Sequence, residues 1–98
     1  MTIPEKYVLR LYVTGLTPRS TRAIHAVRTV CEQRLAGHFD LEIIDVYQQP
    51  SRITQDQVVA IPTLVREQPA PVRYIVGDMS DQFRLLKGLG LPLADGDA

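Results

Sequence analysis

The chain begins with a strand-like pattern of hydrophobic residues. Residues 7–13 read Tyr-Val-Leu-Arg-Leu-Tyr-Val, so that one face is wholly apolar and the other carries a single charge, at Arg10. A strand with two largely apolar faces is typical of an inner position in a sheet that is covered on both sides. Residues 41–46 continue the aliphatic pattern and predict a second strand.

Between these two strands the hydrophobic period changes to that of a helix. Residues 18–35 place apolar side chains at helical spacing with charged side chains between them. Thr17 is the expected N-cap and Pro18 the first helical residue, where a missing N–H has no consequence. A turn around Gly15 precedes this cap, and Gly37 ends the helix. A strand, a helix and a strand in this order predict a right-handed, parallel βαβ unit.

A proline organises the second half of the chain. Residues 51–59 predict a short helix, and Pro62 directly precedes the aliphatic run of residues 63–66. Because proline lacks an N–H and disfavours helix in the residue before it, Pro62 is expected to end the helical segment and to open a strand. In thioredoxin-like folds a proline in this position is often cis, and a trans proline at an ordinary junction is the alternative.

The residues after this strand predict a hairpin and a final helix. Pro71 lies in a connector that leads to a strand at residues 72–76, antiparallel to the one before it. Gly77-Asp78 then breaks the chain. Ser80 is the expected cap of a last helix that runs to about Leu89.

The order of these elements, βαβαββα, predicts an α/β fold of the thioredoxin-like type with three layers. The length suits one domain, residues 1–98, with an ordered core at about 7–91 and flexible termini. A formal net charge of +0 gives no footprint for nucleic acid, and no apolar run is long enough to span a membrane. One cysteine excludes an intrachain disulfide, which suits a cytoplasmic protein.

The positions that would carry thioredoxin chemistry lack thiols. Redox thioredoxins place a Cys-x-x-Cys pair at the start of the first helix, where the helix dipole lowers the thiol pKa. Leu16 and Arg19 occupy those positions here, and the single cysteine, Cys31, falls in the apolar stripe of the helix. His25 and His38 have no cysteine or carboxylate at zinc spacing. The sequence therefore predicts a protein that is not an enzyme and needs no metal or other cofactor.

Several segments, in their order along the chain, resemble proteins of the KaiB family. They are the opening run from Tyr7 to Ala23, Ile44-Asp45-Val46, Pro50, residues 60–64, Pro71-Val72-Arg73 and Gly77-Asp78-Met79-Ser80. The resemblance covers roughly residues 7–91 and extends to the N-terminal sensor domain of SasA-type histidine kinases. No single segment is diagnostic, but the ordered set is specific.

The resemblance implies a non-catalytic protein-binding module in circadian or stress-related signalling. The implied partner is a KaiC-like ring ATPase, whose phosphorylation or ATPase state the module would modulate, and a homo-oligomer, dimer or tetramer, is left open. The expected contact residues are Arg22, Gln57, Val58, Ala60 and Arg73. Structural roles are expected for Gly15, Pro18, Pro62, Pro71, Gly77 and Asp78.

Departures from the family pattern leave other functions open. Gln57 stands where the family commonly has a lysine, and Tyr74 where a second basic residue often occurs. A divergent partner or a role outside the clock would fit these changes. One alternative is a divergent thioredoxin- or glutaredoxin-type enzyme that binds glutathione beside Pro62, with Thr17 and Arg19 as its helpers. Another is a stand-alone sensor domain of a histidine kinase system.

The family also implies an alternative fold. Some members switch between the thioredoxin-like arrangement and a βαββααβ ground state, in which the segment around residues 88–93 supplies a closing strand. Here that segment reads Gly-Leu-Gly-Leu-Pro-Leu. Two glycines and Pro92 weaken a strand, so we expect the thioredoxin-like arrangement as the resting state.

Overall fold

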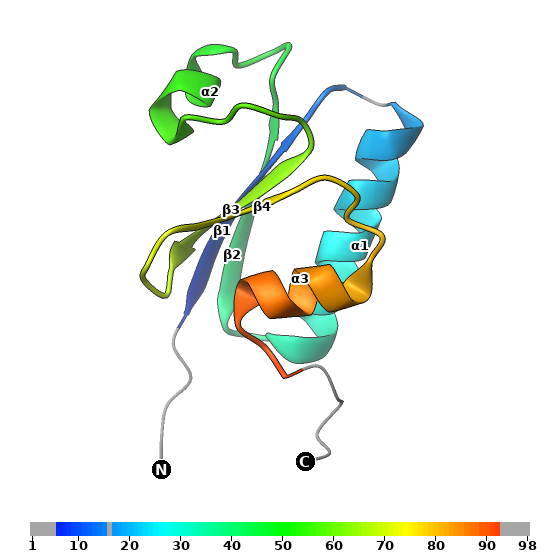
Figure 1. Ribbon diagram of the computed structural model, residues 1–98, viewed down its shortest axis with the longest axis vertical. Helices are drawn as coiled ribbons and strands as arrows, with labels where there is room; N and C mark the ends of the chain where they lie inside the picture. Colours follow the sequence, from blue (N-terminus) through cyan, green and yellow to red (C-terminus); the bar gives the residue numbers. More distant parts are fainter. Residues whose placement is uncertain (1–5, 16, 93–98) are drawn as a thin grey trace.

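Four strands form one mixed sheet in the computed structural model, which describes residues 6–15 and 17–92 (Figure 1). The strands are β1 (Tyr7–Val13), β2 (Phe39–Asp45), β3 (Thr63–Gln68) and β4 (Arg73–Val76). Their order is β2-β1-β3-β4, with β1 parallel to β2, β3 antiparallel to β1, and β4 antiparallel to β3. The predicted parallel βαβ unit, the hairpin and the inner position of β1 are confirmed.

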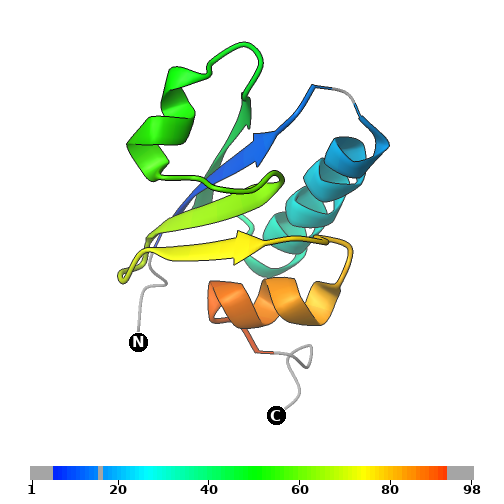
Figure 2. The ribbon, with the colours of Figure 1, turned by 45° about the horizontal axis from the view of Figure 1, so that its top comes forward.

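Three helices cover the two faces of this sheet. α1 (Pro18–Arg34) and α3 (Gln82–Leu89) pack on one face, and the short α2 (Ser51–Asp56) lies over the other (Figures 1 and 2). The element order is therefore βαβαββα in three layers, as predicted, and the βαββααβ arrangement is not the one that the described residues adopt.

The two faces differ in how much they bury. The core under α1 and α3 includes Leu9, Leu11, Val13, Val27, Val30, Cys31, Leu64, Ile75, Leu85, Leu86 and Leu89. The core under α2 holds Tyr12, Ile44, Val46, Val58 and Val65. The alternation along β1 sends side chains to both cores, which is why both of its faces are apolar.

The helix ends follow local capping chemistry, with one correction. Thr17 caps α1 as predicted, because its hydroxyl accepts a hydrogen bond from the backbone N–H of Ser20 at 3.2 Å. The cap of α3 is Asp81, whose carboxylate accepts from the N–H of Arg84 at 3.3 Å, and the prediction of Ser80 was wrong. The Ser80 hydroxyl instead donates a hydrogen bond to the Asp78 carboxylate at 2.7 Å, so it does not cap α3.

The helix α2 ends at Asp56, whereas the sequence pattern extended it to residue 59. Gln57 takes a left-handed backbone conformation with φ of 55°, and the chain then turns so that Val58 is buried against the sheet. A continued helix would forgo this burial, so packing overrides the local propensity. Smaller shifts occur at β2, which begins at Phe39 rather than residue 41, and at β4, which begins at Arg73.

Close packing on β4 and two hydrogen bonds from β1 and β3 hold α3 against the sheet. A side chain at Gly88 would place its Cβ 2.4 Å from Cγ1 of Ile75, so only glycine lets the helix rest on the strand here. At the C-terminal end of α3, the Leu89 carbonyl accepts from the Tyr7 hydroxyl and from Nη1 of the buried Arg66, each at 3.0 Å. A cation at this end also interacts favourably with the helix dipole.

Candidate partner-binding surface

Four connections of the chain meet at one end of the sheet. Gly15 follows β1, and its N–H donates to the Asp45 carboxylate at the end of β2, at 3.2 Å. Pro62 precedes β3, and its carbonyl accepts from the N–H of Gly77, which follows β4, at 3.4 Å. Gly15 and Gly77 have φ of 57° and 104°, values that side chains disfavour. We call this end the loop surface, defined by residues 14–15, 17–22, 45–47, 57–62 and 77–80.

The start of α1 belongs to the loop surface, and the hydroxyls of Thr17 and Ser20 are engaged in the turn before the helix. The Ser20 hydroxyl accepts from the Thr14 N–H at 3.0 Å and from the Thr17 hydroxyl at 2.9 Å, and it is buried. Both hydroxyls are therefore committed to closing the turn before the helix. Arg19 is exposed, and Leu16 lies outside the described residues, as do residues 1–5 and 93–98 of the termini.

The remaining candidate for thiol chemistry is buried far from this surface. Cys31 is fully buried in the core between α1 and the sheet, and burial raises the pKa of its thiol to about 11. A thiol in such surroundings stays protonated and inert. Among the described residues no group of His, Cys, Asp and Glu could hold a metal ion, and none of their helices is long and apolar enough to cross a membrane.

A cluster of ionic and polar side chains, Arg10, Tyr12, Asp56 and Glu67, connects the end of α2 to the sheet. Arg10 of β1 pairs with both oxygens of the Asp56 carboxylate, at 2.7 and 2.9 Å, and also contacts Glu67. The Tyr12 hydroxyl contacts the same carboxylate and lies 2.9 Å from the Arg52 carbonyl. Arg10 lowers the pKa of Asp56, whereas burial and the Asp56 charge raise the pKa of Tyr12 to about 12. Asp56 therefore stays ionised and Tyr12 protonated across the physiological range.

The expected contact residues divide between two places. Gln57 and Ala60 lie on the loop surface, where the Ala60 carbonyl accepts from the Thr63 hydroxyl at 2.6 Å. Arg22 is exposed on α1 at the border of the loop surface, near Asp78, whereas Arg73 begins β4 at the end opposite to Gly77. Val58 is only 7% exposed and packs under α2, so it can act on a partner only through its neighbours.

Three of the structural positions also have defined surroundings. The peptide bonds before Pro62, Pro69 and Pro71 are cis. Pro62 is buried at the head of β3, and the Pro71 carbonyl accepts from Nη2 of Arg66 at 3.1 Å. Hydrogen bonds from Ser80 hold the pKa of Asp78 below its usual value, helped by the charge of Arg22, so Asp78 is a fixed anion beside the start of α1.

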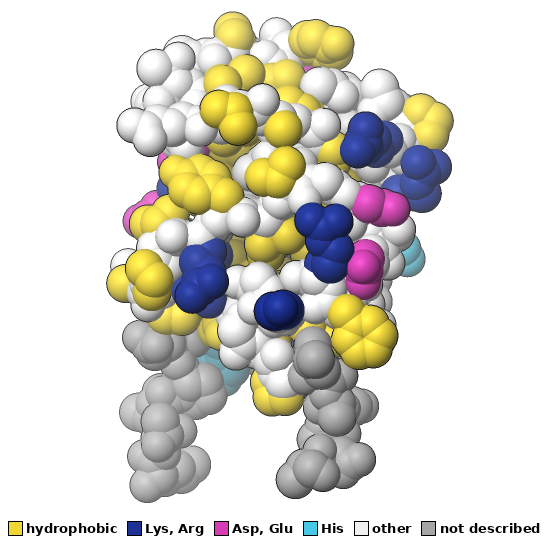
Figure 3. Space-filling model, viewed as in Figure 1, with side chains coloured by type: hydrophobic (Ala, Val, Ile, Leu, Met, Phe, Trp, Pro, Cys, Tyr) yellow, Lys and Arg dark blue, Asp and Glu magenta, His cyan; other side chains and the backbone are white. Residues whose placement is uncertain are grey.

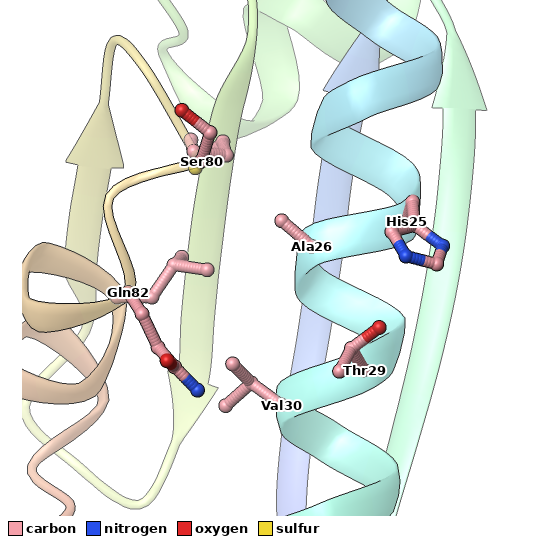
Figure 4. A pocket seen from close by; sticks show the side chains of 8 residues that line it. His25, Ala26, Thr29, Val30, Ser80 and Gln82 are labelled. Carbon is pink, nitrogen blue, oxygen red and sulfur yellow. The ribbon is translucent and has the colours of Figure 1, made fainter.

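Two hollows flank the loop surface. On the α2 side, Gln57, Val59, Thr63, Tyr74 and Val76 line a hollow of about 250 Å³. Between α1 and α3 a groove of about 180 Å³ has Ala26 and Val30 on one wall and Gln82 on the other, and Arg22 lines its continuation (Figure 4). Val59 was not among the expected contact residues, and Tyr74 was named only as a departure from the family pattern; two adjacent valines, Val58 and Val59, were the only sign of the hollow in the sequence.

A model of the KaiB domain matches residues 10–91. The chain belongs to the KaiB family. Its relatives include circadian clock oscillator proteins KaiB from Gloeothece citriformis, 44% identical over 90 residues that cover 92% of this chain and 85% of the relative. The KaiB of Nostoc punctiforme is 45% identical over 96 residues, which cover 95% and 92% of the two chains. The predicted family is thus confirmed, and the chain is KaiB-like over nearly its whole length.

Solved structures confirm the thioredoxin-like fold of this KaiB-family chain. The N-terminal domain of SasA from Synechococcus elongatus superposes with a TM-score of 0.71 at 23% identity, covering 97% of this chain and 93% of that one. The thioredoxin Deadhead from Drosophila melanogaster gives 0.70 at 15% identity, covering 88% and 80%. At these identities the likeness concerns the fold alone.

Proposed function

We propose that this KaiB-family chain is a non-catalytic module that binds a KaiC-like ring ATPase in the cytoplasm and modulates its ATPase or phosphorylation state. The match to the KaiB domain over residues 10–91 carries the proposal. The state of the loop surface supports it: the hydroxyls of Thr17 and Ser20 are engaged in the turn before α1, and the Cys31 thiol is buried. Such a surface is suited to binding a partner protein rather than to forming a covalent bond with a substrate.

The contact proposed for the ATPase is the loop surface with Arg22, Gln57 and Ala60. Gln57 and Ala60 precede the cis bond at Pro62, the buried Val58 follows Gln57 in the chain, and Arg22 lies near Asp78. Arg73, at the other end of β4, extends the contact along the strand. The neutral Gln57, in place of the usual lysine, predicts that Arg22 and Arg73 carry more of the charge interaction than they do in relatives.

Co-purification of the chain with the KaiC-like ATPase of its own organism, with ATP, with ADP and without nucleotide, tests the proposal. We expect a complex in at least one nucleotide state, and Arg22→Glu should weaken it about tenfold, equivalent to roughly 1.4 kcal/mol. Arg28→Glu is the matched control, because Arg28 is exposed on another side of α1. Absence of a complex in every nucleotide state, or equal loss in both variants, would contradict the proposal. Size-exclusion chromatography, used as the last step of the co-purification, also reports the oligomeric state of the free chain.

A stand-alone sensor module is the second candidate, because the resemblance in sequence extends to the sensor domain of SasA-type histidine kinases, and the SasA domain shares this fold. Such a module would bind the same class of ATPase but would also change the autophosphorylation of a histidine kinase. A kinase assay with the chain added in trans separates the two. The glutathione-binding alternative has less support, because the Thr17 hydroxyl is engaged with Ser20; glutathione transfer that Thr17→Ala abolishes would revive it.

A further inference from the structure

β4 is an edge strand whose outer side is open. It pairs with β3 only, and no other described strand adjoins it. The N–H of Gly77 points to β3, where it donates to the Pro62 carbonyl. Backbone groups alternate in direction along a strand, so those of Tyr74 and Val76 point away from the sheet. The two N–H groups and the two carbonyls of these residues therefore have no partner among the described strands.

The side chains next to this edge are apolar and exposed. Tyr74 is 46% and Val76 39% exposed on the face that α2 covers, and Val59 beside them is 93% exposed. The Tyr74 hydroxyl donates to the Asp56 carbonyl at the end of α2, at 2.8 Å, and its ring lines the hollow of about 250 Å³ together with Val59 and Val76. An added strand would place every second side chain over this hollow, which supplies a site for an aliphatic group.

Basic side chains lie along the same edge. Arg73 is exposed at its start, and Arg84 and Lys87 are exposed on α3 beneath it. Nη2 of Arg84 donates to the Val76 carbonyl at 3.1 Å, and its guanidinium lies over Gly77. Figure 3 shows Lys and Arg side chains among hydrophobic ones on the face that presents β4 and α3. The Arg84 guanidinium therefore caps the Val76 carbonyl. A carboxylate binds a guanidinium more strongly than a neutral carbonyl does, so it can displace Arg84 from this position.

We propose that β4 accepts an extended segment of a partner protein, with alternating acidic and aliphatic residues, as a fifth strand of the sheet. A backbone N–H of the segment replaces Arg84 at the Val76 carbonyl, and the freed guanidinium pairs with a carboxylate of the segment. The aliphatic side chains fill the hollow beside Tyr74. A second copy of this chain fits poorly, because an antiparallel β4 pair would bring Arg73, Arg84 and Lys87 of both copies together. This site goes beyond the ATPase contact and does not depend on it.

The test uses the full chain and two short capped peptides, one of alternating glutamate and valine and the other with lysine in place of glutamate. Amide shifts in ¹H–¹⁵N spectra report where each peptide binds. We expect the acidic peptide to shift Tyr74, Val76 and Gly77 with a dissociation constant below about 1 mM, and the lysine peptide to bind about tenfold more weakly. N-methylation of alternate peptide amides should abolish binding, because backbone pairing would be lost.

Two charge variants sharpen the result. Arg84→Glu should weaken the acidic peptide about tenfold and strengthen the lysine peptide, whereas Arg28→Glu on α1 should leave both unchanged. Spectra of the variants without peptide serve to check that they are folded. Shifts centred on Arg19 and Arg22, equal binding of the two peptides, retention of binding after N-methylation, or no binding at about 1 mM would each overturn the proposal. Arg84 is not among the proposed ATPase contacts, so the two proposals can fail separately.

Discussion

The two faces of the sheet are held by different forces. Under α1 and α3 a continuous apolar core forms, whereas α2 covers a small cluster and is tied down by Arg10, Tyr12 and Asp56. The stability that comes from apolar burial does not depend on pH, but it is lost when a cavity is created in the core. The stability that comes from an ion pair depends on the charges of its residues and therefore on pH. The face that is held by charges is also the one that carries Gln57, Val59 and the hollow beside β4. The hollow proposed to take up a partner segment therefore lies on the face with the thinner covering layer.

The largest expected effect is a break in the apolar face. Leu64 is fully buried on β3 between the sheet and the helices. Leu64→Ala should lower the free energy of unfolding by about 3 kcal/mol, through lost transfer energy and the cavity that remains. Urea unfolding followed by circular dichroism measures this. Phe83→Ala is the control, because Phe83 is exposed on α3 and should change stability by less than about 0.5 kcal/mol. Equal effects would contradict the assignment of the core.

A break in the ionic tie should cost less. Asp56→Ala removes the acceptor of Arg10 and Tyr12 and should lower the free energy of unfolding by about 2 kcal/mol. Hydrogen exchange should speed up in residues 51–59 before it does in α1, because α2 loses its tie to the sheet. Asp40→Asn serves as the matched control, since Asp40 pairs with the exposed Lys6 and does not contact α2. Uniform loss of protection across the chain would argue against a local tie.

Acid should loosen the α2 face selectively. The pKa of Asp56 is lowered in the folded chain by Arg10, so below about pH 5 the unfolded chain takes up this proton first. The contribution of Asp56 is therefore present above about pH 4 and is lost as pH falls further. Asp56→Asn should flatten the dependence of stability on pH between about 5 and 3. An unchanged slope in the variant would show that Asp56 titrates normally.

The smallest effect is expected at an ion pair outside both cores. Lys6 and Asp40 approach to 2.8 Å, but their side chains are 60% and 65% exposed. Lys6→Ala should change the free energy of unfolding by less than about 0.5 kcal/mol, since water and salt screen such a pair. The same urea titration, repeated at high salt, measures it. A loss comparable with that of Asp56→Ala would remove the distinction between the exposed pair and the buried tie.

Local chemistry explains which elements could be predicted. The Thr17 cap and the alternation along β1 are properties of neighbouring residues, so sequence alone indicated both elements. The end of α2 could not be found in this way, because it depends on the burial of Val58 against residues distant in sequence. The choice of Asp81 over Ser80 as a cap depended on a third residue, Asp78, which engages the serine. Both misses are decided by contacts that periodicity does not encode.

The same reasoning applies to the candidate surface. The positions of Pro62 and Gly77 could be predicted, because turns have strong residue preferences. The pairing of Arg10 with Asp56 could not, since 46 positions separate them and charged residues on a strand usually face water. The hollow beside Tyr74 includes Gln57 and Val59, which follow the end of α2, whereas the sequence pattern placed both residues inside the helix.

The buried Cys31 thiol gives the chain an internal probe of its own opening. It is the single cysteine of the sequence and is fully enclosed by the larger core. A maleimide or iodoacetamide reagent can label it only in molecules whose core has opened, so the labelling rate measures how often α1 separates from the sheet. Mass spectrometry then follows that opening without any engineered tag. A partner that holds the core closed will slow the labelling, and one that selects an opened conformation will accelerate it.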